Sequence, residues 1–282
     1  MPCATTGVVE LDQSSPPTAR HIVNTARASR YIAGMAEAVT AEAPQLTKPR
    51  ILRQDWLNLS FLHWAVAPGS IAHLYPAGTE PDVFEGRSYV GMVPFHMDNT
   101  GLPRGPVLLR TFLETNVRLY SVDGTGRRGV VFLSLDANRL DVVAAARSVF
   151  GLPYRWARMS YQSQAGRHTY TSNLRWPGVT AASTVRVQVG DPVKLGPLEH
   201  FLTARWGLHL SRAGRTWYLP NDHPAWALRT AELIGFRDDG LLASVGLGDL
   251  GRRPPDHVAF SDGVPARFAL PVRATTPRRL SE

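Results

Sequence analysis

The chain has 282 residues, a length that suits one large domain or one domain with an appendage. Its 44% hydrophobic content is enough for a sizeable core, and no run approaches the roughly 18 consecutive apolar residues of a membrane span, so we expect no membrane partner. The net charge of +8 comes almost entirely from scattered arginines without a nucleic-acid-binding motif, which argues against a nucleic-acid partner.

The cysteine and histidine usage narrows the chemistry further. Cys3 is the only cysteine, so neither an internal disulfide nor a cysteine-based metal site can form. The histidines lack metal-ligand spacing, and no phosphate loop or dinucleotide fingerprint is present, so we expect no metal and no cofactor. The N-terminus carries Glu10 and Asp12 where a signal peptide needs an apolar stretch, and we therefore expect a cytoplasmic protein.

Residues 1–48 are predicted to be a tail followed by an appended helix. Residues 1–17 are polar and contain proline and serine, which is typical of a disordered tail. Residues 18–42 have partial helical spacing, with Thr18 as a candidate cap and Pro44 beyond the end. This helix is expected to pack on the main domain or on a second subunit, so a homo-oligomer stays open.

Residues 49–272 are predicted to form an α+β, mainly β domain, and residues 273–282 a flexible tail. Short apolar runs alternate with Gly, Pro, Asn and Asp, a pattern typical of mostly antiparallel β structure. The predicted strands are Ser88–Phe95, Val107–Val122, Gly129–Leu135, Arg167–Trp176, Ala182–Val189 and Thr216–Leu219, the predicted helices are Arg139–Phe150 and Pro197–Trp206, and a short turn is predicted at Gly69–Leu74.

The segment 113–120 alternates strictly between polar and apolar residues. Glu114, Asn116, Arg118 and Tyr120 share one face of an extended strand, since successive side chains point to opposite sides. This pattern fits an antiparallel strand with one wet face, or a strand whose polar face lines a cavity. We prefer the cavity because of the strand that follows.

That following strand, residues 130–136, places Ser134 and Asp136 on one face, after a hairpin signal at 123–126. The two strands can then present Glu114, Arg118, Ser134 and Asp136 to one space. An arginine fork among carboxylates suits a carboxylate ligand, with a carboxylate left to move protons. The alternative is that Arg118 forms a structural ion pair with Glu114 or Asp136.

Several blocks in order resemble the uncharacterised YqjF-like family of bacterial proteins, from about Arg53 to about Pro271. They are Gln54–Trp56, Phe61–Trp64, Tyr89–Phe95, Glu114–Tyr120, Phe132–Ala137, Gly151–Tyr154 and Leu198–Thr203. The segment Arg147–Ala157, with Glu114 in an earlier strand, also resembles the active-site segment of acetoacetate decarboxylase. These resemblances imply a cone-like antiparallel β-barrel with a central pocket and a few flanking helices.

The resemblance also implies which chemistry is lost. The lysine pair of the decarboxylase falls on Tyr154 and Arg155 here, and Ser148 replaces a glutamate. A tyrosine cannot form a Schiff base, and arginine stays protonated and non-nucleophilic. The acetoacetate decarboxylase reaction needs a lysine amine that is uncharged at the working pH.

The sequence therefore predicts a pocket protein that binds or transforms a small organic acid or carbonyl compound without Schiff-base decarboxylation. Arg118 is the candidate carboxylate-binding group, with Asn116, Ser134 and Arg155 beside it. Glu114, Asp136 and Tyr154 are the candidate catalytic residues of a cofactor-independent lyase, isomerase or hydratase. A non-catalytic binding or regulatory protein with the same pocket is the alternative, and an assembly protein that uses the N-terminal helix is a further one.

Overall fold

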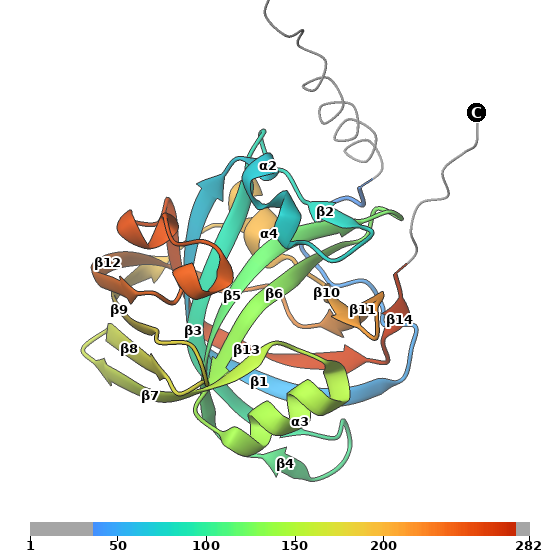
Figure 1. Cartoon of the computed structure of the whole chain (residues 1–282), viewed down its shortest axis with the longest axis horizontal. Helices are drawn as coiled ribbons and strands as arrows, with labels where there is room; N and C mark the ends of the chain where they lie inside the picture. Colours follow the sequence, from blue (N-terminus) through green and yellow to red (C-terminus); the bar gives the residue numbers. More distant parts are fainter. Residues whose placement is uncertain (1–35, 275–282) are drawn as a thin grey trace, which may run out of the picture. The chain divides into compact units, whose positions relative to one another are not determined.

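The computed structural model describes residues 36–274, most of which lie in one sheet of 14 strands (Figure 1). The strands are β1 (Arg50–Val66), β2 (Thr79–Pro81), β3 (Ser88–Gly101), β4 (Val107–Leu109), β5 (Phe112–Asp123), β6 (Arg128–Ala137), β7 (Tyr154–Gln164), β8 (Arg167–Leu174), β9 (Ala182–Pro192), β10 (Gly207–Arg212), β11 (Arg215–Asp222), β12 (Leu228–Asp239), β13 (His257–Ala269) and β14 (Val272–Arg273). The helices are α2 (Pro68–Ile71), α3 (Leu140–Phe150) and α4 (Pro197–Thr203), with short 3-10 helices η1 (Ala72–Leu74), η2 (Ala243–Val245) and η3 (Leu250–Arg252).

The mainly β, largely antiparallel architecture predicted from the sequence is confirmed. The strand β6 pairs with β5, β7 and β10, and consecutive pairings through β7, β8, β9, β12, β13, β1, β3 and β5 return to β6. The β6–β7 pairing is parallel, because α3 carries the chain back to the start of the sheet between them.

All six predicted strand segments contain strands, but the pattern missed seven others. The predicted strand 107–122 is split into β4 and β5 by a break at Arg110 and Thr111. The strands β1, β2, β7, β10, β12, β13 and β14 were not predicted. The longest of them, β1, is buried on both faces from Leu59 to Trp64, so it is not a strand with one wet face.

Parts of the predicted tails fall outside the described residues. The predicted helix 18–42 lies outside as far as residue 35, and residues 36–42 are not helical. The predicted tail 273–282 is described only at Arg273 and Ala274, and Arg273 ends β14. No helix among residues 36–274 combines the length and the apolar character needed to span a bilayer.

The strands β5 and β6 are joined with a bulge that changes which face each β6 residue occupies. Val117 pairs with Ser134, but the next residue, Arg118, pairs with Phe132, so Leu133 is an extra residue in β6. Because strand residues alternate between faces, one extra residue reverses the faces on its two sides. This bulge decides which β6 side chains lie beside Glu114 and Arg118.

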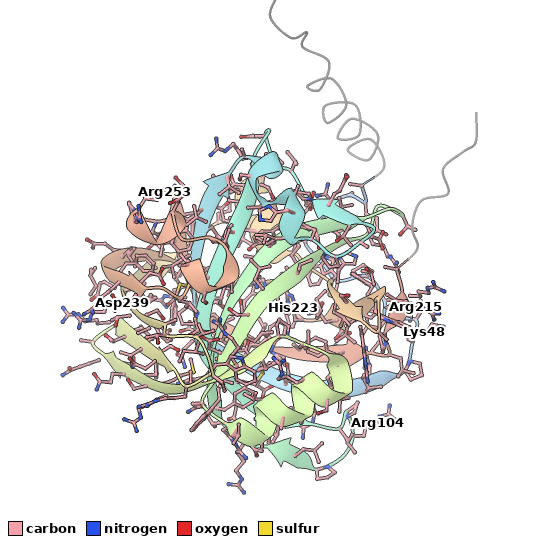
Figure 2. The ribbon with its side chains drawn as sticks, viewed as in Figure 1. Lys48, Arg104, Arg215, His223, Asp239 and Arg253 are labelled. Atoms are coloured by element: carbon pink, nitrogen blue, oxygen red, sulfur yellow. The ribbon has the colours of Figure 1, made fainter. Side chains whose placement is uncertain are left out.

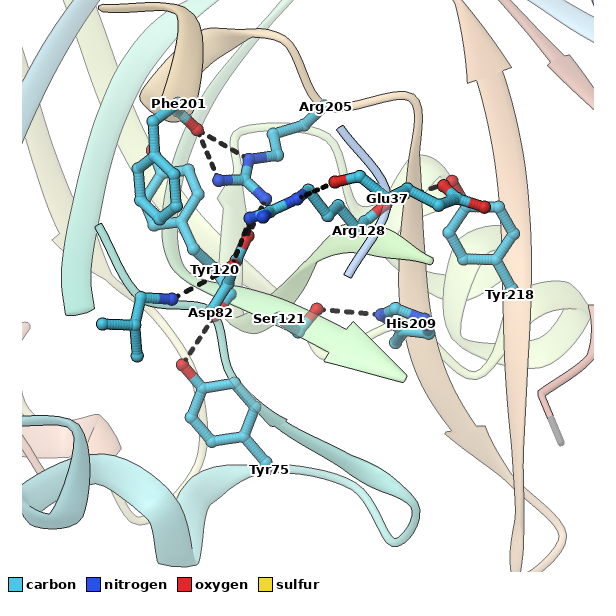
Figure 3. Close-up of polar contacts among 11 residues, drawn as sticks. Glu37, Tyr75, Asp82, Tyr120, Ser121, Arg128, Phe201, Arg205, His209 and Tyr218 are labelled. Carbon is cyan, nitrogen blue, oxygen red and sulfur yellow. Dashed lines mark hydrogen bonds and ion pairs between the residues drawn. The ribbon is translucent and has the colours of Figure 1, made fainter. Parts of the chain in front are cut away.

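One buried ion-pair cluster is centred on Asp82, whose carboxylate is 3% exposed (Figure 3). Arg128 and Arg205 both form ion pairs with Asp82, and Arg205 also donates to the backbone carbonyl of Phe201. The guanidinium of Arg205 lies 5.0 Å from the ring centroid of Tyr120. Both guanidinium groups of this cluster are therefore held by the one carboxylate of Asp82.

Candidate functional site

A cavity of about 280 Å³ lies between the sheet and α3. Residues from β1, β3, β5, β6 and α3 line it, and most of them are aliphatic or aromatic. Its polar lining residues are few: Gln54, Thr100, Glu114, Asn116, Arg118 and Tyr154. A mostly apolar cavity with a small number of convergent polar groups is the usual form of a small-molecule site.

The strand β5 supplies three of these polar residues. Glu114, Asn116 and Arg118 alternate with Thr115 and Val117, so all three point into the cavity while their neighbours point away. Each is separated from the next by about 6.6–7 Å along the strand. The structure thus places the polar face of the segment 113–120 inside a cavity rather than in solvent.

Glu114 is buried, with only 2% of its surface exposed. The hydroxyl of Tyr154 donates a hydrogen bond of 2.6 Å to Oε2, and Nδ2 of Asn116 donates one of 3.3 Å to Oε1. Burial raises the pKa of Glu114 to about 7, against the two hydrogen bonds that lower it. Glu114 is therefore a carboxyl group that can gain or lose a proton near neutral pH.

Tyr154 reaches Glu114 because of the turn that joins α3 to β7. Gly151 ends α3 with φ at 70°, a left-handed conformation that glycine adopts without steric cost. Arg147, in the last turn of α3, then donates to the backbone carbonyl of Tyr154 at 2.9 Å. Burial and the neighbouring Glu114 raise the pKa of Tyr154 well above 10, so its hydroxyl stays protonated and acts as a donor.

Arg118 forms no hydrogen bond or ion pair with any of residues 36–274, and its Nε is buried. Its guanidinium lies 5.5 Å from the ring centroid of Phe61 and 5.6 Å from that of Tyr120. Gly91 is its neighbour on β3, where a Cβ would lie 3.2 Å from Cγ and Nε of Arg118. The arginine is thus held by packing and aromatic faces, and its hydrogen-bonding capacity is left for another molecule.

The structure does not bring Ser134, Asp136 and Arg155 into this cavity, which corrects the expected convergence. The bulge at Leu133 turns Phe132 and Leu135 toward the cavity, and Ser134 and Asp136 away from it. Asp136 instead accepts a 2.6 Å hydrogen bond from Nε of Arg155 in a buried ion pair.

Arg155 follows Tyr154 on β7, so its side chain points to the opposite face. It also donates to Ser244 at 2.8 Å. The ion pair that the sequence offered as an alternative therefore exists, but Arg155 forms it rather than Arg118.

The lysines of the chain lie elsewhere. Neither Lys48 nor Lys194 lines the cavity, and Lys48 (Figure 2) lies in a different hollow beside residues 37–47. Within the described residues, no three His, Cys, Asp or Glu side chains cluster as a metal site would require. His63 is a fully buried residue whose ring contacts the Tyr120 hydroxyl at 2.7 Å and His257 at 3.0 Å.

The helical wall of the cavity was not predicted from the sequence. Val142, Ala145, Ala146 and Val149 line it, and their spacing is that of one face of a helix. The spacing is visible in the sequence. It shows that α3 has an apolar stripe, but not which surface the stripe covers.

The chain was compared with known families, and residues 53–265 match DUF2071, described as an uncharacterized conserved protein. The chain belongs to the DUF2071 family. It is also 31% identical over 186 residues to the uncharacterized protein YqjF of Bacillus subtilis strain 168, covering 64% of this chain and 76% of that one. The YqjF-like membership predicted from the sequence is thereby confirmed.

Solved structures share the fold of this DUF2071 chain at low sequence identity. The enduracididine biosynthesis enzyme MppR complexed with pyruvate has a TM-score of 0.55 at 16% identity, with 83% of this chain and 94% of that chain covered. Acetoacetate decarboxylase from Legionella pneumophila has a TM-score of 0.51 at 12% identity, covering 83% and 91%. The acetoacetate decarboxylase-like fold is therefore shown.

Proposed function

We propose that the cavity binds and transforms a small organic acid or carbonyl compound by proton transfer, without a Schiff base. The observation that carries this proposal is Arg118, a guanidinium without a partner among residues 36–274, in a mostly apolar cavity. Arg118 is partly buried and its Nε is fully buried without a hydrogen-bond partner, and a carboxylate matches the arginine fork in two parallel hydrogen bonds. We also propose that the closed circuit of strand pairings is the cone-like barrel that the sequence predicts.

The positions of Arg118 and Glu114 give the two residues separate proposed roles, carboxylate binding and proton transfer. They lie four residues apart on one strand, so their Cα atoms are separated by about 13 Å, twice the same-face spacing. A ligand with its carboxylate at Arg118 reaches toward Glu114 with a carbon several atoms away. Asn116 lies between them and offers an amide to an oxygen of the ligand.

Glu114 is the proposed proton carrier. A general base or acid works best when its pKa lies near the operating pH, as that of Glu114 does. Tyr154 is the proposed positioning residue, since its hydroxyl holds one carboxylate oxygen of Glu114. Removing a proton next to a carbonyl, or adding one to the resulting enol, fits a lyase, isomerase or hydratase step.

The lining of the cavity supports a reaction that does not pass through an imine, since neither lysine is in it. The fold it shares with MppR, a protein whose structure is complexed with pyruvate, is consistent with an oxo-acid ligand.

The second candidate function is that of a non-catalytic binding protein. Both oxygens of Glu114 already accept hydrogen bonds, which favours a rigid binding group.

Two measurements test the proposal with 2-oxobutyrate as the probe. In a thermal-shift titration, a ligand at 100 times its Kd stabilises the protein by about 2.7 kcal/mol. We expect this shift to be absent in Arg118→Met and retained in Arg104→Met, an exposed arginine (Figure 2) that lines no part of the cavity. An equal shift in both variants would contradict the proposed carboxylate site.

The second measurement separates the enzyme from the binder. In ²H₂O, proton abstraction exchanges the C3 hydrogens of 2-oxobutyrate, which proton NMR records as lost signal. We expect wild-type protein to accelerate the exchange and Glu114→Gln to bind the acid without doing so. Binding without accelerated exchange in the wild type would establish the non-catalytic reading.

A further inference from the structure

We propose that the ligand is an amphipathic acid, with a carboxylate at Arg118 and an apolar tail of about seven to nine carbons that extends to the mouth of the cavity. This inference rests on the proposed carboxylate site and adds the chemical class of the rest of the molecule. It is carried by the order of side chains along the cavity, by the position of its mouth and by its size.

The pairing of β3 with β5 orders the lining from polar to apolar. Starting at Arg118, the same face of β5 presents Asn116, then Glu114, then Phe112, while β3 presents apolar residues opposite. Beyond Phe112 the strand β4, paired with the end of β3, continues the wall. In order from the arginine, the pairs are Gly91–Arg118, Val93–Asn116, Phe95–Glu114, Met97–Phe112 and Thr100–Leu109.

Two exposed apolar residues of the lining mark its mouth, Leu108 of β4 at 58% exposed and Val149 of α3 at 53%. Leu108 lies at the end of the wall away from Arg118. Glu114 and Asn116 are 2% and 4% exposed. These two polar groups are therefore inside and apolar groups form the rim, which is the reverse of a site for a small, fully hydrated acid.

The rest of this outer section is almost entirely apolar. The α3 stripe covers it from one side, and Met97 and Phe112 lie on the other. Two polar residues are also present: Gln54, whose Oε1 already accepts the indole N–H of Trp56, and Thr100. An aliphatic or aromatic tail that leaves water for this section gains the hydrophobic contribution of each carbon it buries.

The volume sets the size of that tail. An engineered cavity of about 150 Å³ in another protein holds one benzene molecule. The present cavity, about 280 Å³, is nearly twice as large. It therefore accommodates about ten to twelve non-hydrogen atoms, whereas 2-oxobutyrate has about seven and leaves the outer section unfilled.

Isothermal titration calorimetry with straight-chain acids from acetate to decanoate tests whether the cavity binds an apolar tail. The same measurement with 1-octanol, which has no carboxylate, tests whether the carboxylate is recognised. We expect the affinity to rise about fourfold for each added methylene up to octanoate or decanoate, since each methylene enters an apolar environment. We expect 1-octanol to bind far more weakly than octanoate, and Arg118→Met to remove that difference.

Two variants narrow the outer section of the cavity, and a third serves as their control. Ala146→Phe fills it from α3, and Val149→Trp does so from an exposed position where a folding defect is not expected. Ala144→Phe places the same ring on the same helix at an exposed position outside the cavity. We expect the first two to lower octanoate affinity at least tenfold with little change for acetate, and Ala144→Phe to leave both unchanged.

The outcomes separate this inference from the function on which it rests. If the affinity is the same from acetate to decanoate but still depends on Arg118, the apolar tail is contradicted and the acid site is retained. If the affinity rises with chain length but is equal for octanoate and 1-octanol, and is unchanged in Arg118→Met, then Arg118 does not bind the carboxylate. Absence of binding by every acid overturns both.

Discussion

Two arginines lie against the same aromatic ring, and they differ in whether the protein provides an anionic partner. The guanidinium of Arg205 is 5.0 Å from the Tyr120 ring centroid and that of Arg118 is 5.6 Å away. Arg205 is ion-paired with Asp82, which also pairs with Arg128 (Figure 3). Arg118, by contrast, has no anionic partner among residues 36–274.

The difference distinguishes a structural charge from one kept for a ligand. Around Asp82 each charged group has a partner within the protein, and the cluster holds α4 and the loop after β2 together. Arg118 instead lies against aromatic faces and beside Gly91, and no carboxylate among residues 36–274 pairs with it. Four variants test this contrast, ordered from the largest expected effect to the smallest.

The largest effect is expected from Asp82→Asn. The change leaves two arginines, one of them 4% exposed, without their counter-charge, and breaking a buried ion pair from one side costs about 3–5 kcal/mol. Urea unfolding measures the loss. As a matched control, Asp239→Asn breaks the exposed pair with Arg237 and should leave the urea midpoint nearly unchanged (Figure 2). Equal shifts in the two variants would show that the Asp82 cluster is not a structural unit.

The next largest effect is expected from Glu114→Gln, which should change how the unfolding free energy depends on pH. Because the pKa of Glu114 is raised from 4.5 to about 7 in the folded state, the folded protein is penalised when the carboxyl ionises. No penalty exists below pH 4.5, and it grows to about 3 kcal/mol as the pH rises through 7. Relative to wild type, the variant should therefore gain about that much stability between pH 4.5 and pH 8. A difference in unfolding free energy that does not change with pH would contradict the raised pKa.

A smaller effect is expected from Tyr154→Phe. The tyrosine hydroxyl donates to the ionised form of Glu114, and a hydrogen bond to a charged group contributes about 1.5–3 kcal/mol. Its loss should raise the pKa of Glu114 further, by about one unit. Carbon-13 NMR titration of the Glu114 carboxyl measures the change, with Tyr161→Phe as a control outside the cavity. An unchanged or lower pKa would show that Tyr154 does not position the carboxylate.

The smallest effect on stability is expected from Arg118→Met. Since no group in the described part of the chain pairs with this guanidinium, removing it should leave the unfolding free energy within about 1 kcal/mol of wild type. Arg205→Met should cost clearly more, because Phe201 and Asp82 lose a donor. Chemical unfolding of both variants provides the comparison. A large loss in Arg118→Met would mark Arg118 as structural and weaken the proposed acid site.

Much of the site was visible in the sequence. The alternation in 113–120 places Glu114, Asn116 and Arg118 on one face, because backbone geometry alone makes strand side chains alternate. The Gly-Leu-Pro turn before Tyr154 was recognisable by its resemblance to the decarboxylases, and so was the loss of the lysine pair. The mainly β class followed from the spacing of the turn residues.

The sequence by itself determined which chemical groups are available: carboxyl, amide, guanidinium and phenol on two short segments, with no amine nearby in the chain. Only the tertiary structure decided how they are combined. The extra residue Leu133 turns Asp136 away to pair with Arg155, while Phe132 moves into the cavity. A bulge depends on how two strands register against each other, so a pattern read along one strand does not contain it. Likewise, the sequence shows the apolar stripe of α3, but only the packing of α3 against the sheet makes it the wall of a cavity.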